Sequence, residues 1–107
     1  MEPSPEGWSI TAADEVEWVP WGPDGDARAK VLAGADGAHV LLVEADAGYR
    51  GAPHQHEHAE FLYVVHGTLR TQGRTMHAGD AYAAAAGSTH DDFEAVTAAG
   101  YVLVFRL

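Results

Sequence analysis

Several histidines and one glutamate lie at spacings that would let them bind a metal ion together. His54, His56, His58 and Glu60 occupy alternate positions of one short segment, and His90 lies much further along the chain. In an extended strand, side chains two residues apart point to the same face about 7 Å apart, so two of them can bind one ion side by side. Three imidazoles and a carboxylate suit a catalytic divalent metal. All four residues of the segment 54–60 named above would point to the same face, and any three of them could act as ligands. The ligand set therefore stays open at this point.

Glycines at regular distances frame these residues. The segment that starts at Gly48 reads GYRGAPHQHEHAEFLYVVHG, and the segment that starts at Gly79 reads GDAYAAAAGSTHDDFE. The first resembles a motif of the cupin family: Gly, five residues, His-x-His, three residues, Glu, six residues, Gly. The second resembles its partner motif: Gly, five residues, Pro-x-Gly, two residues, His, three residues, Asn. Two departures are plain, because Ala85 stands where the family usually has Pro and Glu94 where it usually has Asn.

The resemblance implies a fold and a ligand set. Cupins are all-β proteins with a jelly-roll, or double-stranded β-helix, barrel. By the family pattern, one divalent transition metal per chain would be bound by the side chains of His54, His56, Glu60 and His90. His58 is not a ligand in that pattern, so we expect it at the pocket rim or on the surface. Iron is the metal that we favour, although Mn, Ni, Co and Zn accept the same ligands.

Composition limits the partners that we expect. A chain of 107 residues has room for one domain, 1–107, with motifs at 48–67 and 79–94 and further strands within 7–44. Its net charge of -10 repels phosphate backbones and anionic lipids, so we expect no nucleic acid partner. The longest apolar run, 81–86, is too short to span a membrane. The absence of cysteine and of a secretion signal favours a cytoplasmic location.

Short runs of β-branched and aromatic residues between Gly, Pro and Asp clusters predict strands throughout the chain. We expect strands at 7–11, 16–21, 28–32, 39–44, 60–66, 68–72, 74–76, 80–84, 92–97 and 101–107. Breaks are expected at 23–26, 34–37, 73, 78–80 and 98–100. Many short strands at this spacing indicate a jelly roll or a closed barrel.

Strand alternation predicts which side chains line the barrel interior. If His90 faces inward, Asp92 and Glu94 do so too, and Glu94 becomes a candidate general base, unless it is only hydrogen-bonded at a strand end. The alanines around Tyr82 are too small to fill a barrel, so we expect an open cavity beside the metal. Tyr82 is the second candidate catalytic residue because it could line that cavity, and Arg50 could stand at its mouth, although either could equally be a solvated strand residue.

The same alternation predicts the outer surface. If Glu60, Leu62 and Val64 face inward, their neighbours point outward and form a large apolar patch. These neighbours are Phe61, Tyr63 and Val65. The carboxy-terminal strand is apolar on both faces, and together these features predict a homodimer. The three N-terminal tryptophans, Trp8, Trp18 and Trp21, are expected on the barrel's outer face or against a second subunit, with a role in the pocket as the alternative.

Three classes of function agree with these features. The resemblance to small single-domain cupins favours a mononuclear non-heme Fe(II) oxidoreductase of the dioxygenase type, acting on a small enolisable or aromatic substrate. A non-redox enzyme, such as an isomerase or a polyketide cyclase that uses Zn or Mn as a Lewis acid, is the second class. The third is a sensor or binding cupin that holds a metal without catalysis. The identity of the metal, together with O2 consumption, separates the three.

Overall fold

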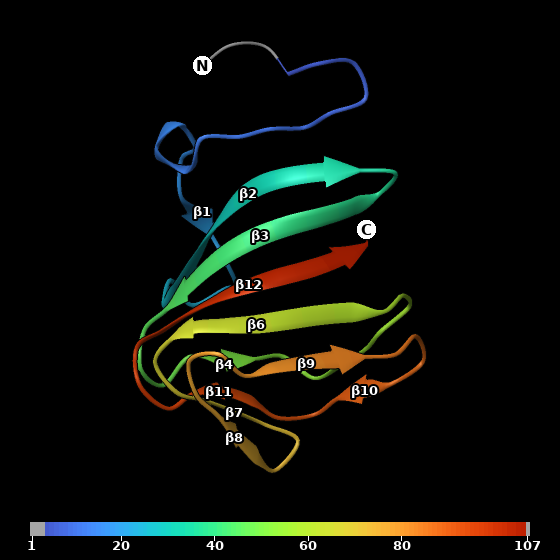
Figure 1. The fold of residues 1–107 in the computed structure, drawn as a ribbon. Helices are drawn as coiled ribbons and strands as arrows, with labels where there is room; N and C mark the ends of the chain where they lie inside the picture. Colours follow the sequence, from blue (N-terminus) through green and yellow to red (C-terminus); the bar gives the residue numbers. More distant parts are fainter. Residues whose placement is uncertain (1–3, 107) are drawn as a thin grey trace.

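The chain is built almost wholly from β-strands, as the computed structural model of residues 4–106 shows (Figure 1). A single 3-10 turn, η1 (Ala13–Glu15), precedes the strands of the described part. The strands are β1 (Val19–Pro20), β2 (Ala27–Ala35), β3 (Ala38–Ala45), β4 (Arg50–Gly51), β5 (His54–Gln55), β6 (Glu60–His66), β7 (Leu69–Thr71), β8 (Arg74–Met76), β9 (Ala81–Ala84), β10 (Thr89–His90), β11 (Phe93–Ala95) and β12 (Ala99–Arg106). Among residues 4–106, no helix is long and apolar enough to cross a membrane.

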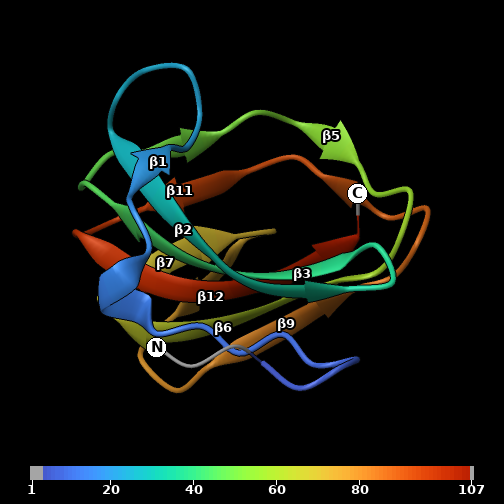
Figure 2. The ribbon, with the colours of Figure 1, turned by 90° about the horizontal axis from the view of Figure 1, so that it is seen from above.

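Two antiparallel sheets and one ribbon form a jelly-roll barrel. The larger sheet has six strands in the order β1-β2-β3-β12-β6-β9, and the smaller has four in the order β4-β11-β7-β8. β5 and β10 pair separately as a two-stranded ribbon. Figure 2 shows β11 and β5 across the interior from β3, β12 and β6. The predicted all-β jelly roll is therefore confirmed.

Two tight hairpins close at turns that the sequence marks clearly. Asp36 and Gly37 between β2 and β3 have φ angles of 53° and 83°, and Gln72 and Gly73 between β7 and β8 have φ angles of 49° and 74°. Two consecutive positive φ angles define a type I′ turn, whose twist matches that of the flanking strands. Glycine at the second position adopts this conformation without a steric penalty.

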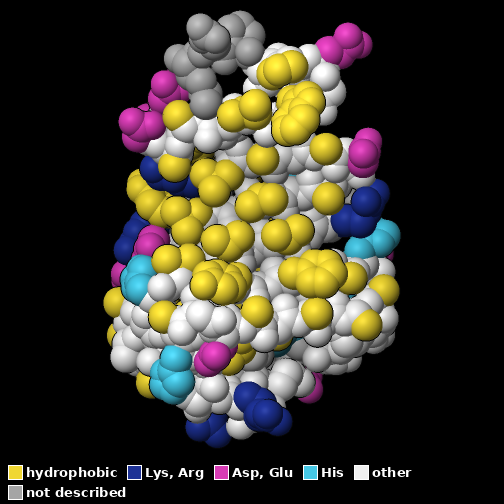
Figure 3. All heavy atoms as spheres, viewed as in Figure 1, with side chains coloured by type: hydrophobic (Ala, Val, Ile, Leu, Met, Phe, Trp, Pro, Cys, Tyr) yellow, Lys and Arg dark blue, Asp and Glu magenta, His cyan; other side chains and the backbone are white. Residues whose placement is uncertain are grey.

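Alternation along β6 separates the core from the outer surface. Leu62 and Val64 are buried, whereas Phe61, Tyr63 and Val65 are about half exposed. The parity prediction for this strand is therefore confirmed. The rest of the core comes from both sheets and includes Leu41, Val43, Leu69, Phe93, Tyr101 and Leu103. Figure 3 shows hydrophobic side chains gathered over the outer face of the six-stranded sheet.

Several expected strands differ from the observed ones. Residues 7–11 form no strand, and the strand expected at 16–21 shortens to β1. Trp8 and Ile10 are exposed, so their apolar alternation there does not reflect packing on a sheet. The sequence also did not predict β4, β5 and β10, because two-residue strands are too short to show a period.

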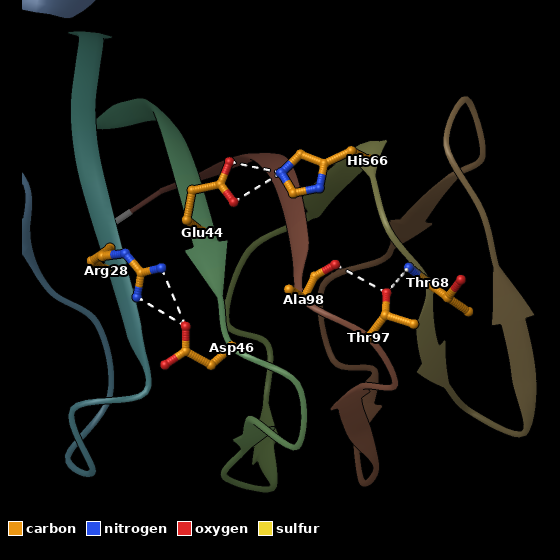
Figure 4. A network of polar contacts seen from close by, with 7 residues as sticks. All are labelled: Arg28, Glu44, Asp46, His66, Thr68, Thr97 and Ala98. Carbon is orange, nitrogen blue, oxygen red and sulfur yellow. Dashed lines mark hydrogen bonds and ion pairs between the residues drawn. The ribbon is translucent and has the colours of Figure 1, made fainter.

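The break expected at 98–100 is wrong, because Ala99 and Gly100 begin β12. Glu44 on β3 and His66 on β6 reach toward each other over Gly100, and His66 Nε2 lies 2.9 Å from both carboxylate oxygens (Figure 4). A Cβ atom at Gly100 would lie 2.5 Å from atoms of both side chains. The glycine therefore permits this contact across the central strand and does not end the strand.

Replacing Gly67 by alanine is expected to lower the free energy of unfolding by at least about 3 kcal/mol. Gly67 has a φ of +81°, and a Cβ there would collide with the Ala98 carbonyl oxygen and the Ala99 backbone. Gly73→Ala is the matched control, since Gly73 has a φ of +74° and open space around the position. The control should lose only about 1–2 kcal/mol. Chemical denaturation measures both values, and equal losses would contradict the steric argument.

Candidate metal centre

Three histidines from two distant segments meet on one ribbon. In the pairing of β5 with β10, His54 lies opposite His90. The pairing continues past the ribbon, because His56 N–H donates to the Ser88 carbonyl at 2.9 Å and Gly87 N–H donates to the His56 carbonyl at 2.7 Å. One potential ligand nitrogen from each of His54, His56 and His90 lies within 4.8 Å of the others. The group is suited to a metal ion.

Each of these imidazoles uses one ring nitrogen for a protein oxygen. His54 Nδ1 lies 2.9 Å from the Ala52 carbonyl, His56 Nδ1 lies 3.1 Å from Ser88 Oγ, and His90 Nε2 lies 2.8 Å from Thr71 Oγ1. A carbonyl only accepts, so His54 carries its proton on Nδ1 and has a lone pair on Nε2. Such outer contacts are what orients histidine ligands in metal sites.

Two of the remaining nitrogens are buried and make no hydrogen bond. Among residues 4–106, neither His56 Nε2 nor His90 Nδ1 has a hydrogen-bond partner. Leaving a buried polar atom unpaired costs about 1–3 kcal/mol, so such atoms in a native fold call for an explanation. A bound cation would satisfy both atoms, and it would use the electron pairs that neutral imidazoles offer. The donor set therefore fits a divalent metal.

Glu60 stands beside the histidines and is held by Tyr82. Glu60 Oε2 lies 3.5 Å from His56 Nε2, and the Tyr82 hydroxyl donates a hydrogen bond to the same oxygen at 2.5 Å. Burial is the larger cause and this contact with Glu60 the smaller cause of a raised pKa of Tyr82, so the Tyr82 hydroxyl keeps its proton. Glu60 is not a member of the three-histidine group, and its role as a fourth ligand stays a prediction.

Burial also affects His90. Desolvation lowers its pKa below the usual value of 6.5, although the nearby Glu60 carboxylate acts in the opposite direction. His54 and His56 add to the lowering. A lowered pKa means that His90 is neutral at pH 7 and has a lone pair available for a metal.

A cavity of about 430 Å³ opens onto the histidines. Its wall combines the three imidazoles and Glu60 with aromatic side chains, among them Trp21, Tyr49, Phe93, Tyr101 and Phe105. Trp21 lines this cavity and packs against Phe105 with ring centroids 6.3 Å apart, so its expected place on the outer face is wrong and the alternative place in the pocket holds. Trp8 and Trp18, by contrast, are exposed.

A second cavity, of about 650 Å³, lies beside the alanine run and also touches His56 and His90. It is lined by the small side chains of residues 81 and 83–85 together with Tyr82. The open space expected beside these alanines is confirmed. Tyr82 borders both cavities, since it also lines the smaller one.

The inward orientation expected for Asp92 and Glu94 is wrong. Asp92 accepts the backbone N–H groups of Gln72 and Gly73, and Glu94 forms an ion pair with Arg50 at 3.2 Å. Phe93 between them is the buried residue. Glu94 and Arg50 line neither cavity that borders the histidines. Glu94, the expected general base, therefore lies away from the histidines.

His58 lies where the family pattern implies, since it is exposed and lines the rim of the smaller cavity. It does not belong to the three-histidine group. Sequence reasoning missed Thr71 and Ser88, the two hydroxyl groups that contact His90 and His56. No local pattern marks them, because their contacts depend on strand pairing.

The antiparallel jelly roll and the three-histidine cluster are those expected of a cupin, and the sequence comparison agrees. The chain belongs to the ChrR cupin-like domain family, whose family model matches residues 7–106. The resemblance to cupins is thereby confirmed. No curated protein matches the chain.

Solved structures share the fold at low sequence identity. A protein assigned as an acetylacetone dioxygenase from Methylibium petroleiphilum superposes with a TM-score of 0.85 and 22% identity, over 99% of this chain and 81% of that one. KdgF from Halomonas sp. gives 0.77 and 27%, over 94% of both chains. A Rhodobacter sphaeroides structure, SigE in complex with the anti-sigma ChrR, gives 0.75 and 21%, over 88% of this chain and 51% of that one.

Proposed function

We propose that this chain is a metal-dependent cupin oxidoreductase of the dioxygenase type, which acts on a small enolisable or aromatic molecule. The observation that carries the proposal is the convergence of three histidine nitrogens within 4.8 Å beside an aromatic-walled cavity of about 430 Å³. That volume lies in the range of small-molecule sites. The fold likeness to a protein assigned as an acetylacetone dioxygenase supports the reaction class.

The chain's own residues would bind the metal and orient the substrate. His54, His56 and His90 would hold the ion, with Glu60 as the fourth ligand. When bound, a divalent metal here supplies Lewis acidity and, if it is iron, reactivity toward O2. Tyr82 keeps its proton and fixes one Glu60 oxygen beside His56.

The cavity wall favours an apolar substrate body. Tyr49, Phe93 and Tyr101 form successive edge-to-face contacts, with centroids 6.2 and 5.4 Å apart. Such rings exclude water and give the site an apolar wall. Arg106, the arginine on this wall, is exposed and extends toward Gly37 at the β2–β3 turn. The substrate's polar end would therefore be recognised at the metal.

A metal-holding sensor is the second candidate, and the family match supports it. The matched family takes its name from ChrR, which one of the similar structures contains as an anti-sigma protein in complex with SigE. In that case the same histidines would bind metal, and the protein would show no turnover.

Metal content and O2 uptake test the proposal. Protein purified without chelator should contain close to one divalent transition metal per chain, with iron supporting activity. O2 consumption would then be measured with small 1,3-diketones and with catechols, using His56→Ala as the control that lacks the site. Zn or Mn content without O2 uptake would favour the non-redox class. Full metal content without turnover of either substrate group would favour the sensor.

We further propose that the outer face of the six-stranded sheet forms a homodimer. Phe61, Tyr63 and Val65 are about half exposed on this face. Together with the partly buried Val102 and Val104 of β12, Phe61 and Tyr63 line a shallow hollow. Complete burial of a side chain of this size contributes about 1.5–3 kcal/mol relative to exposure. In Figure 3 the acidic side chains lie mostly at the margins of this face and not over its centre.

Tyr63→Glu should shift the protein from dimer toward monomer, because a carboxylate would be buried without a partner at the interface. Light scattering at micromolar concentration should give about twice the 11.4 kDa chain mass for the wild type. Val96→Glu is the control, since Val96 is exposed to a similar extent and lies outside the six-stranded sheet. A wild-type monomer would refute the interface. Metal content should be the same in all three proteins.

A further inference from the structure

The Ser88 hydroxyl has only one proton, and its neighbours determine where that proton points. Ser88 Oγ lies 2.6 Å from the Ala85 carbonyl and 3.1 Å from His56 Nδ1. The carbonyl has no proton to give, so Ser88 must donate there. Toward His56 the hydroxyl can then only accept. His56 consequently carries its proton on Nδ1 and has the lone pair on Nε2.

Backbone pairing holds the two residues in this arrangement. His56 N–H donates to the Ser88 carbonyl at 2.9 Å, and Gly87 N–H donates to the His56 carbonyl at 2.7 Å. Gln55 adds a third bond, from its side-chain nitrogen to the Gly87 carbonyl at 3.0 Å. With these bonds on both sides, the position of Ser88 beside the His56 ring is set by the strand register.

The turn that precedes Ser88 presents the acceptor. Ser88 N–H also donates to the Ala85 carbonyl, at 3.1 Å, and closes a four-residue turn. Gly87, at the third position of this turn, has a φ of +88°, as a type II turn requires. Ala85 is also the residue that replaces the family's usual proline. The turn is thus closed by two bonds from Ser88 to one carbonyl.

We propose that Ser88 is a positioning residue that fixes the tautomer of His56, through the relay from His56 Nδ1 to Ser88 Oγ to the Ala85 carbonyl. The lone pair is then held on Nε2, which is buried, lies 3.5 Å from Glu60 Oε2 and has no hydrogen-bond partner among residues 4–106. The effect of this relay on metal affinity rests on the proposed function. Without the relay, the proton is free to occupy Nε2, where it blocks coordination by that atom.

The first test uses the metal-free wild-type protein. Long-range ¹H–¹⁵N spectra of the imidazole ring at pH 8 distinguish the two neutral tautomers. His56 should be protonated at Nδ1, whereas exposed His58 should show the mixture of tautomers that a solvated ring adopts. A His56 ring protonated at Nε2 would overturn the proposal. This measurement needs no variant, so the proposal stays testable even if a substitution prevents folding.

The second test compares three variants. Ser88→Ala removes the acceptor, so His56 should lose its preference for the Nδ1 proton and Zn²⁺ affinity should fall about 10- to 100-fold. Ser88→Thr keeps a hydroxyl and should restore both readouts. Thr89→Ala changes the exposed neighbouring residue and should change neither. Zn²⁺ affinity is measured by competition with a chelating dye.

The outcomes separate this proposal from the proposed function. An unchanged His56 tautomer together with unchanged Zn²⁺ affinity in Ser88→Ala would overturn the role of Ser88. If the wild type binds no divalent metal, the proposed function fails, but the tautomer comparison still decides the relay. A tautomer shift in Ser88→Ala that Ser88→Thr reverses would then support the relay alone.

Discussion

Alanine at His54, His56 or His90 is expected to remove most of the bound metal, with affinity falling more than about 100-fold for each variant. Loss of a ligand should exceed the 10- to 100-fold effect that is typical of a residue behind the ligands. The three ring nitrogens lie within 4.8 Å of one another, so each variant removes one point of a compact group. Metal per chain after dialysis against a weak chelator measures the effect.

His58→Ala is the matched control for these variants. His58 is an exposed histidine from the same segment, it lies on the cavity rim, and it stands outside the three-histidine group. It should retain nearly full stoichiometry. Retention by any two of the three ligand variants would contradict the assigned site, and a large loss in His58→Ala would mean that the ligand set is wrong.

Metal removal should lower the melting temperature at neutral pH, by on the order of 10 °C. A ligand at 100 times its Kd stabilises the native state by about 2.7 kcal/mol, and 1 kcal/mol shifts the melting temperature of a domain of this size by about 4–8 °C. Protons compete with metal for the same lone pairs, and free histidine titrates near 6.5. The difference between melts with and without chelator should therefore shrink between about pH 6 and pH 5.

The metal-free protein has a pH dependence of the same sign. Burial lowers the pKa of His90 in the folded chain below its unfolded value of 6.5. As pH falls below about 6.5, the unfolded chain binds more protons than the folded one, and stability decreases. Melts at neutral and acid pH, with and without chelator, check both effects. A melting temperature at neutral pH that does not respond to chelator would count against stabilisation of the fold by bound metal.

Local alternation predicted the parts of the fold that have continuous strands. β6 is an example, because its two faces differ sharply and both neighbouring strands pair along it. Its observed range agrees with the predicted 60–66, and Leu62 faces inward while Tyr63 faces outward. The motif spacing similarly indicated three histidines that the structure brings together. For β6 the information lies within one short segment, whereas for the histidines it lies in the two motifs at 48–67 and 79–94.

Alternation failed where the chain leaves the strand. Between β10 and β11, Asp91 N–H donates to the Gln72 side chain, and the Asp92 carboxylate accepts both N–H groups of the adjacent β-turn. These contacts interrupt the inward–outward alternation, so that His90 and Phe93, three residues apart, both face inward. Glu94 consequently faces away from the histidines. Such contacts join residues about 20 positions apart, and no pattern within 89–95 reports them.

The histidine-bearing ribbon belongs to neither large sheet, and this separation bears on kinetics. β5 and β10 are two residues each and pair only with one another in the described part of the chain. Elements with few pairing partners open locally at free energies well below that of global unfolding. An ion bound across His54, His56 and His90 would join both halves of the ribbon, so opening would require its release. The ribbon should therefore open more slowly in the metal-bound protein than in the metal-free protein.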